Sequence, residues 1–240
     1  MKTIACVLVF ISMSIAVMGQ TATTIDSTVV DVDGNVYHTV EIGSQIWMVE
    51  NLRTSHYRNG DAIQCVAVDS LWEPLYIGAY CIYNNEPANE LVYGKLYNYY
   101  ALDDKRNIAP KGWRVATCAD WDVLLEYLPT VFYLSGDSTF NNAKYIASPK
   151  YWKKSDVDGS VGFKANKNNV LKFFGLPAGY RHNSGVYKGL TTSAYWWCYS
   201  PSGTSEMLAL SKSIWFDSNE IQTNLGFKMR GLSVRCVKDL

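Results

Sequence analysis

The residues of this sequence best suited to chemistry are its cysteines. The 240-residue chain has six, the first of which lies in an N-terminal apolar run. The five that follow the run are Cys65, Cys81, Cys118, Cys198 and Cys236. The closest two are 16 residues apart, so there is no Cys-x-x-Cys pair or close Cys/His cluster. We therefore predict no metal site, and the thiols are candidates for disulfides, for buried free groups or for one nucleophile.

Cys118 has the surroundings that most favour reactivity. It lies in the stretch 108–121, IAPKGWRVATCADW, at an expected helix start, where the helix dipole favours a thiolate. Catalysis also needs a base within hydrogen-bond reach, and the three histidines, His38, His56 and His182, form no recognisable pairing motif with it. We favour a disulfide and predict no catalytic residue and no cofactor. A buried free thiol and a reactive thiol remain alternatives.

Five thiols allow at most two disulfides and leave one thiol over. Our first prediction is a Cys118–Cys198 bridge, and our second is Cys65–Cys81, which leaves Cys236 unpaired. The sequence does not distinguish between the fifteen arrangements that leave one thiol free. Such bridges would close loops in a chain with few regular elements.

Aromatic residues form the second chemically interesting group. The chain has eight Trp and seventeen Tyr, which are densest in the YNYY and YWW segments. Exposed aromatic faces stack on sugar rings, so Tyr99, Tyr195 and Trp196 are candidate contacts for a glycan. The alternative, which we favour, is that these residues fill a core between short sheets. Strand alternation predicts Tyr195 and Trp197 on one face and Trp196 on the other.

Three arginines, Arg114, Arg181 and Arg235, lie inside apolar segments. A buried guanidinium is costly unless it is paired, so each is either a structural anchor for carbonyls and carboxylates or a ligand contact. We favour the structural role and keep Arg181 as a candidate for binding sugar hydroxyls.

The N-terminus has the pattern of a secretory signal. A lysine precedes the apolar run 3–18, which breaks at small residues near Gly19. A membrane anchor would need about 20 apolar residues, and this run is shorter. We predict a signal peptide over 1–19, a short segment over 20–29, and one domain over 30–240 with no transmembrane segment in the mature chain.

Export would place the mature chain in the periplasm, at the cell surface or outside the cell. The full chain has 22 basic and 22 acidic residues, and removal of Lys2 with the signal peptide would leave the mature chain with a net charge near −1. A nearly neutral chain creates no field that favours nucleic acid or an anionic membrane, so we expect neither as a partner. No internal repeat indicates an array, and the oligomeric state is not predicted.

Local patterns predict short strands and little helix. Asp33-Gly34 between alternating apolar residues favours a hairpin turn, and Gly43-Ser44 favours a second one. Calcium loops at Asp31 and Asp156 are rejected because the required Gly and Glu positions are occupied by other residues.

One convincing helix follows Thr117, which can cap its first turn. Trp121, Leu124 and Leu128 recur on one face, and Pro129 is expected to end the helix. Strand pairs are expected within 79–102, with a short helix at its end, and another short helix at 141–147. Further strands are expected at 171–176, 195–199, 207–210, 214–216 and 232–237.

Eight ordered motifs resemble one family of exported bacterial domains. They are DVDGNVYHTVEIGSQIWMVENLR, GAYCIYNN, YGKLYNYYAL, PKGWRVATCADWDVL, GFKA, LPAGYRHNSGVY, YWWCYS and GLSVRCVKD. The chain is similar over most of its length to the Fibrobacter succinogenes major paralogous domain, a family defined by sequence. The family usually has cysteine where this chain has Ala109, and the resemblance implies that such a cysteine would bridge to the position of Cys236. Ala109 cannot form that bridge.

A more distant resemblance concerns the fold. GWRVATCADWDVLLEYL is similar to the helix entry of the formylglycine-generating-enzyme family, and GLSVRC resembles its closing strand. This resemblance implies a C-type-lectin-like fold, in which short antiparallel sheets, one or two helices and long loops are closed by neighbouring chain ends. We therefore expect a loop-rich α+β domain, and fold alone does not carry function.

The functional expectation is an exported, non-catalytic recognition module that binds a glycan or a cell-surface protein. Phosphate-loop, dinucleotide, Gly-x-Ser-x-Gly and His-Glu-x-x-His motifs are missing from the sequence. The alternatives are an enzyme related to the formylglycine-generating fold and an architectural component of a surface assembly.

Overall fold

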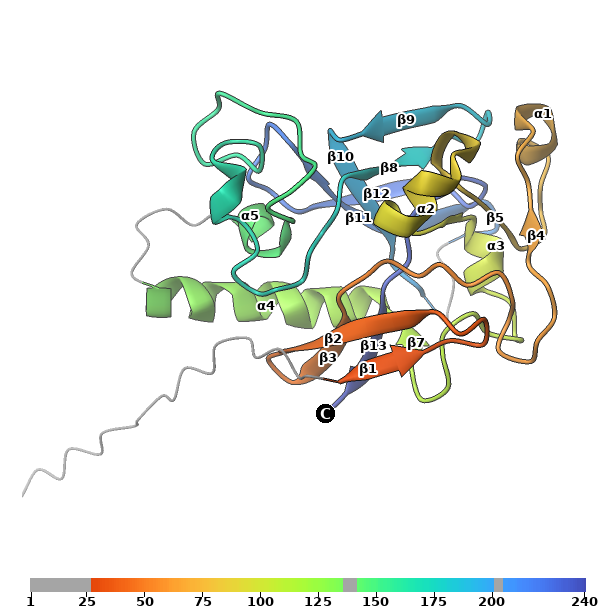
Figure 1. The fold of residues 1–240 in the computed structure, drawn as a ribbon, viewed down its shortest axis with the longest axis horizontal. Coiled ribbons are helices and arrows are strands. Elements are labelled where there is room, and N and C mark those ends of the chain that lie inside the picture. The colour runs from red at the N-terminus through yellow and green to blue at the C-terminus, as the bar shows by residue number, and fades with distance from the viewer. Residues whose placement is uncertain (1–26, 136–141, 201–204) are drawn as a thin grey trace, which may run out of the picture.

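The computed structural model describes residues 27–135, 142–200 and 205–240. The expected leader, residues 1–19, and most of the 20–29 segment lie outside them, so both remain predictions. Within the described residues, no helix is both long enough and apolar enough to cross a bilayer. Three small sheets, of which two are mixed and one is antiparallel, make up the domain together with a few helices and long loops, which confirms the expected loop-rich α+β class (Figure 1).

The first sheet brings the two ends of the described chain together. Its strands, in spatial order, are β1 (Thr28–Val30), β2 (Val36–Ile42), β3 (Gln45–Met48), β13 (Cys236–Asp239) and β7 (Arg114–Val115), each antiparallel to its neighbours. The two expected hairpin turns connect β1 to β2 and β2 to β3. Gly34 and Gly43 have φ of 82° and 62°, values that glycine adopts without strain. Because β13 lies between β3 and β7, the C-terminal strand closes the domain.

The second sheet forms the other layer of the domain. Its spatial order is β12 (Gln222–Phe227), β11 (Leu208–Trp215), β10 (Ser193–Trp197), β8 (Ala178–Arg181) and β9 (Tyr187–Leu190). All neighbours are antiparallel except β10 and β8, which are parallel. The predicted strands at 207–210 and 214–216 are parts of one strand, β11, because the residues between them also pair with β10.

A third, smaller sheet and several short helices lie beside these two sheets. The sheet has the order β4 (Gln64–Cys65), β5 (Ala79–Cys81) and β6 (Leu96–Tyr97). The helices are α1 (Asp69–Trp72), α2 (Pro87–Tyr93), α3 (Tyr99–Leu102), α4 (Cys118–Ser135) and α5 (Asn142–Ile146), with 3₁₀ turns at Tyr83–Asn85 and Ala165–Lys167. The expected strand pair and final helix of the 79–102 region are present, whereas α2 was not anticipated.

Helix α4 begins where the sequence predicts, with a reciprocal cap. The Thr117 hydroxyl accepts a hydrogen bond from the Asp120 N–H at 3.2 Å, and the Asp120 carboxylate accepts the Thr117 N–H at 2.7 Å. The expected end at Pro129 is wrong, because the helix continues to Ser135. Proline removes only the hydrogen bond to the carbonyl four residues earlier, and three turns already formed before it hold the helix direction.

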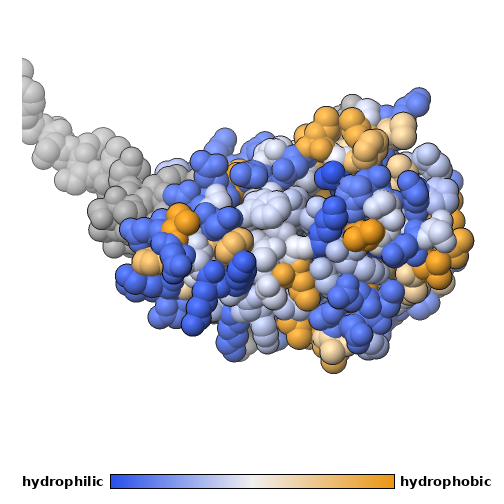
Figure 2. All heavy atoms as spheres, turned by 90° about the horizontal axis from the view of Figure 1, so that it is seen from above, coloured by the Kyte–Doolittle hydropathy of each residue, from blue (hydrophilic) through white to orange (hydrophobic). Residues whose placement is uncertain are grey.

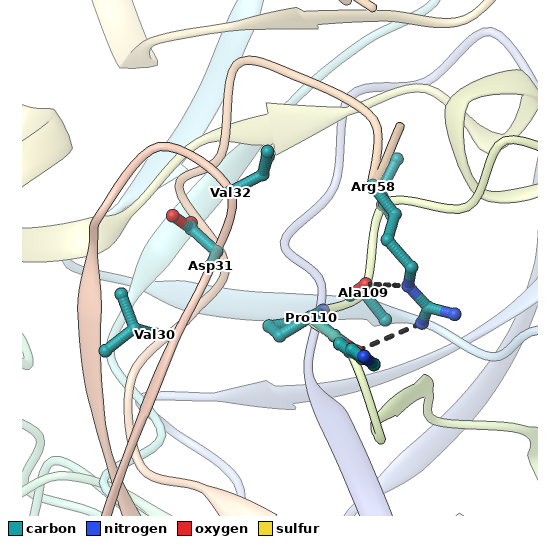
Figure 3. A pocket seen from close by; sticks show the side chains of 8 residues that line it. Val30, Asp31, Val32, Arg58, Ala109 and Pro110 are labelled. Atoms are coloured by element: carbon teal, nitrogen blue, oxygen red, sulfur yellow. Dashed lines mark hydrogen bonds between the residues drawn. The ribbon is translucent and has the colours of Figure 1, made fainter. Parts of the chain in front are cut away.

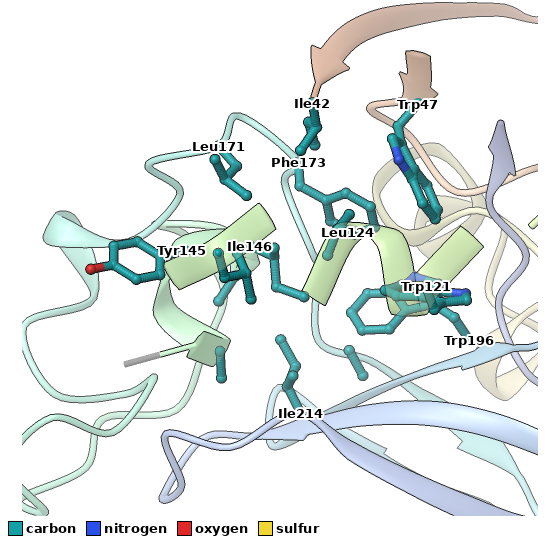
Figure 4. Packing of buried hydrophobic residues seen from close by; sticks show 14 of the residues in the cluster. Ile42, Trp47, Trp121, Leu124, Tyr145, Ile146, Leu171, Phe173, Trp196 and Ile214 are labelled. Carbon is teal, nitrogen blue, oxygen red and sulfur yellow. The ribbon is translucent and has the colours of Figure 1, made fainter. Parts of the chain in front are cut away.

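The main core lies between α4 and the second sheet (Figure 4). Trp121 of α4 packs against Trp47, Phe173 and Trp196, with ring centroids 5.2 to 5.6 Å apart. A second core cluster lies on the other face of β10 and includes Tyr195 and Trp197. The predicted alternation of the YWW segment is therefore confirmed, with Trp196 facing α4 and its two neighbours facing away.

The expected strand at 171–176 is wrong. Lys172 and Phe174 have φ of 56° and 54°, in the left-handed region, which breaks the extended backbone of a strand. The segment instead supplies Leu171 and Phe173 to the main core, so its alternating apolar residues are explained by packing.

Candidate functional site

The four residues proposed from sequence as ligand contacts are buried. Arg181 and Trp196 have no exposed surface, and Tyr99 and Tyr195 are 1% and 8% exposed. The Trp196 indole N–H donates to the Asn51 side-chain oxygen at 2.9 Å, as expected for a satisfied core residue. The structure therefore favours the alternative interpretation of all four, as core residues, and their side chains offer no open face to a glycan.

Arg181 is a structural anchor. Its guanidinium donates to the carbonyl of Gly185 at 2.7 Å and to the Asp69 carboxylate at 2.7 Å. It also donates to two carbonyls next to β4 and lies 4.5 Å from the Trp72 ring centroid. Its donors are occupied by the protein, so they join α1 and the β8–β9 turn to the rest of the domain.

Arg235 has the same role in the middle of the domain. It is fully buried and donates to the carbonyls of Met48, Phe173 and Phe174 at 2.6 to 3.0 Å, and to the Asn51 side chain at 2.8 Å. Burial lowers the pKa of the Arg235 guanidinium, and the surrounding oxygens compensate part of the cost of its charge. Sequence reasoning favoured this structural role, and these contacts confirm it.

A polar and aromatic hollow of about 440 Å³ is the best candidate for ligand binding. Its lining includes residues of β4 and α3, two elements that lie on the same side of the ribbon in Figure 1. We call it the tyrosine hollow; it is lined by Tyr57, Ala62, Gln64, Tyr76, Ile77, Gly78, Tyr100, Asp103, Asp104 and Arg106.

The aromatic wall of the tyrosine hollow is formed by Tyr76 and Tyr100. Their ring centroids are 6.0 Å apart and the planes make an angle of 60°. Tyr76 is 59% exposed, so most of its surface faces solvent. Tyr100 is half-buried, and burial raises the pKa of its hydroxyl. The Tyr100 hydroxyl therefore remains protonated and uncharged at neutral pH.

Asn98 fixes the two walls of the hollow to each other. This buried side chain caps α3 by accepting the Ala101 N–H at 3.2 Å, and it also accepts the Ala79 N–H at 3.0 Å. Its amide group donates to the Ile77 carbonyl at 2.8 Å. One asparagine thus holds the loop that carries Tyr76 against the helix that carries Tyr100.

The floor of the hollow requires a glycine. A Cβ at Gly78 would overlap the Tyr57 hydroxyl and come within 3.0 Å of the Ala101 backbone. Tyr57 is 1% exposed, and the guanidinium of Arg106 lies 4.0 Å from its ring centroid. Burial raises the pKa of Tyr57, and Asp104 adds to that rise while Arg106 opposes it.

The polar rim carries two carboxylates and one guanidinium. Arg106 donates to Asp104 at 2.7 and 2.9 Å and pairs with Asp61 at 3.2 Å, and these bonds from Arg106 lower the pKa of Asp104. Asp103 is exposed and accepts one long hydrogen bond of 3.4 Å from the Tyr199 hydroxyl. Gln64 is also exposed. Asp103 and Gln64 therefore offer polar groups to a ligand, whereas Asp104 is committed to Arg106.

A second, more apolar hollow of about 270 Å³ lies between the β1–β2 turn and residues 108–111 (Figure 3). Arg58 crosses it and donates to the carbonyls of Ala109 and Pro110 at 2.9 and 3.0 Å. The guanidinium also reaches the carbonyl of Trp113 at 2.9 Å. Its charge is used to hold a turn in place, so this hollow offers a ligand fewer polar groups than the tyrosine hollow.

The five described cysteines are free in the structure. Cys118 packs against the core cluster that contains Cys198, and the two thiols are close enough for each to shift the pKa of the other. Cys65 lies beside Tyr80, on the opposite side of β5 from Cys81, because successive strand residues alternate. The structure thus brings together the first predicted pair and separates the second.

The structure gives no support for a metal or a thiol–imidazole site. No group of three or more His, Cys, Asp or Glu suited to a metal is found among the described residues. His38 contacts Glu50, and His56 contacts Asp33. His182 contacts a nearby serine and has its pKa lowered by burial.

The protein is a loop-rich α+β domain in which the C-terminal strand β13 pairs with β3 and β7. A family model, the Fibrobacter succinogenes major domain, matches residues 40–238, so the chain belongs to that family. No curated protein and no solved structure matches the chain significantly. The C-type-lectin-like resemblance therefore remains a prediction.

Sequence reasoning approached the tyrosine hollow without finding it. It selected the YNYY segment, but chose Tyr99, which is buried, instead of its half-buried neighbour Tyr100. Tyr76 and Asp103 were missed, because nothing local shows that residues 57–64 and 76–78 meet the end of α3. The feature of the sequence that could have indicated this hollow is the tyrosine-rich segment 97–100, which is followed by Asp103 and Asp104.

Proposed function

We propose that this protein is an exported, non-catalytic recognition module that binds a neutral glycan in the tyrosine hollow. The observation that carries the proposal is the exposed ring of Tyr76, which lies in the same hollow as the exposed Asp103 carboxylate. Aromatic faces pack against the C–H faces of sugar rings, and carboxylates and amides bind sugar hydroxyls.

The dimensions of the hollow agree with this proposal. Pockets for small ligands typically enclose roughly 300 to 1,000 Å³, and the tyrosine hollow, at about 440 Å³, suits one or two sugar rings. Its lining carries two carboxylates and one guanidinium, which disfavours an anionic sugar. A neutral glycan is the ligand whose chemistry fits both the aromatic wall and the polar rim.

One face of the molecule lacks the broad apolar area through which proteins commonly dock. On the face seen in Figure 2, apolar residues lie in several separate patches among hydrophilic ones. Large continuous apolar patches mark protein interfaces, and the described residues of this face do not form one. A glycan ligand outside the cell is also consistent with the secretory pattern of residues 1–19.

The test compares two matched tyrosine variants. A glycan array containing neutral and anionic oligosaccharides identifies a ligand, and calorimetric titration then measures its affinity for the wild type and the variants. Tyr76→Ala removes the exposed ring of the hollow. Tyr151→Ala is the control, because Tyr151 is 52% exposed and also packs against a second tyrosine. The ring centroids of Tyr151 and Tyr93 are 5.9 Å apart, and those of Tyr76 and Tyr100 are 6.0 Å apart.

We expect a neutral glycan to bind and Tyr76→Ala to weaken its binding about tenfold, which corresponds to about 1.4 kcal/mol. Tyr151→Ala should leave the affinity unchanged. The proposal fails if no neutral glycan on the array binds the protein, or if the two variants weaken binding by the same factor. Binding of anionic glycans alone would also contradict it.

A further inference from the structure

The contact between Cys118 and Cys198 is built by two elements that are distant in sequence. Thr117 and Tyr199 form a parallel bridge, in which the Cys118 N–H donates to the Tyr199 carbonyl at 3.2 Å. The Tyr199 N–H in turn donates to the Ala116 carbonyl at 3.0 Å. The residue that starts α4 is therefore held against the residues that follow β10.

Strand alternation directs the Cys198 side chain toward α4. Trp196 and Cys198 share a face of the β10 segment and belong to the same core cluster, against which Cys118 packs. The neighbouring strand β11 adds Lys212 on that face, because Lys212 pairs with Trp196. The ammonium group of Lys212 bonds to Asp122 at 3.2 Å and to Thr223 at 3.0 Å.

The charged groups around the pair favour a thiolate at Cys118. The adjacent Cys198 thiol and the positive charge of Lys212 lower the pKa of Cys118 to about 7, while burial and the negative charge of Asp122 oppose the effect. The same contact and burial raise the pKa of Cys198. Tyr99 is the other titratable group that senses the Cys118 charge, and its hydroxyl stays protonated because burial raises its pKa.

We propose that Cys118 and Cys198 form an exchange-reactive dithiol, which an external disulfide converts into a covalent bond joining the start of α4 to the end of β10. Cys118 is half-buried and receives the incoming reagent, whereas Cys198 is fully buried and closes the bond from inside. The inference is independent of the proposed glycan binding, because the tyrosine hollow contains neither residue.

The reaction proceeds by two thiol–disulfide exchanges. The Cys118 thiolate attacks one sulfur of the external disulfide, forms a mixed disulfide and expels the first external thiolate. Cys198 then loses its proton to solvent and attacks the Cys118 sulfur, which expels the second external thiolate. The two protein thiols are oxidised by two electrons in total, and one external disulfide is reduced to two thiols.

The other three described cysteines lack either an accessible, reactive thiolate or a neighbouring thiol. Burial raises the pKa of Cys81 and of Cys236 to about 12, so both are expected to be inert at neutral pH. Cys65 is exposed but has no adjacent thiol with which to close a bond. Reagents of the disulfide class should therefore modify Cys65 and Cys118, and only the Cys118 adduct should resolve internally.

The test incubates the reduced, folded mature chain with oxidised glutathione at pH 7.5, followed by non-reducing peptide mapping. We expect a linked peptide pair containing Cys118 and Cys198, and a separate glutathione adduct on Cys65. Cys198→Ser should trap the glutathione adduct on Cys118, and Cys118→Ser should leave Cys198 reduced. Circular dichroism establishes that each variant is folded.

A second readout is the rate at which iodoacetamide alkylates Cys118 in the reduced protein as pH is varied. The rate should rise with a midpoint near pH 7, about two units below that of an ordinary thiol, which is consistent with the shift of Cys118. The proposal is overturned if Cys118 and Cys198 both stay reduced while Cys65 is modified, or if Cys118 bonds to another cysteine. A Cys118 midpoint near 9 would also contradict it.

Discussion

The buried guanidinium of Arg235 makes the most demanding prediction about stability. It binds oxygens of two distant segments, Met48 and Asn51 in one and Phe173 and Phe174 in the other, and so ties three segments together when its own is counted. Arg235→Lys keeps the positive charge but replaces a planar fork with a single ammonium group. The substitution therefore tests the geometry of the contacts and not the presence of a charge.

The magnitude follows from the hydrogen bonds that are lost. The guanidinium of Arg235 makes four hydrogen bonds, and we expect an ammonium group at this position to keep about two of them. Each lost bond from a charged donor that leaves a buried acceptor unpaired costs roughly 1.5 to 3 kcal/mol. We expect a destabilisation of about 4 kcal/mol. In a domain of this size that lowers the melting temperature by roughly 10 °C.

Calorimetry and urea unfolding of the wild type and variant measure the effect. Arg114→Lys is the matched control, because Arg114 is 38% exposed, and it pairs with the buried Asp120 and the exposed Asp239. It should cost about 1 kcal/mol or less. If Arg235→Lys cost no more than this control, the idea that Arg235 ties three segments together would be wrong.

Three further predictions concern the hollow, acid stability and the thiol pair. Gly78→Ala should lower the melting temperature and weaken glycan binding, because the new methyl group displaces the Tyr57 hydroxyl; calorimetry measures both, and unchanged values would contradict the account. Hydrogen bonds outweigh burial and lower the pKa of Asp33 below 3.8, so its stabilisation is present above about pH 4 and is lost as the pH falls further; acid unfolding of Asp33→Asn should lack this loss. Closing the Cys118–Cys198 bond should stabilise the protein by about 4 kcal/mol, from a loop of about 80 residues, and Cys118→Ser should abolish the difference in melting temperature between oxidised and reduced samples.

The sequence predicts best those elements whose causes are local. The Asp33-Gly34 turn needs a residue that tolerates positive φ, and Gly34 provides it. The start of α4 is encoded by the Thr117 and Asp120 side chains, which cap it. Alternation in the YWW segment was enough to place Trp196 on the opposite face from its neighbours.

Other features depend on contacts that no local pattern reveals. The left-handed residues Lys172 and Phe174 break an apparent strand, because the chain there turns to insert Phe173 into the core. The tyrosine hollow combines three loops that only the folded chain brings together. A tyrosine in the sequence carries no mark of its burial. The buried Tyr99 therefore could not be distinguished from the half-buried Tyr100 before the structure was known.

Sequence did bring one distant pair to attention. The cysteine at the start of α4 and the cysteine after YWW were the favoured disulfide partners, and the structure makes them neighbours. The Cys65–Cys81 pairing had no such support, since Cys65 faces the Tyr80 side of β5.

The central claim, that the tyrosine hollow is where a ligand binds, is tested most directly by amide chemical-shift mapping with a neutral oligosaccharide selected on the array. The account predicts that the perturbed amides cluster at residues 57–64, 76–78 and 100–106, with saturation at rising sugar concentration. Perturbations centred on the hollow beside Arg58 or on β12, or none at saturating sugar, would contradict it.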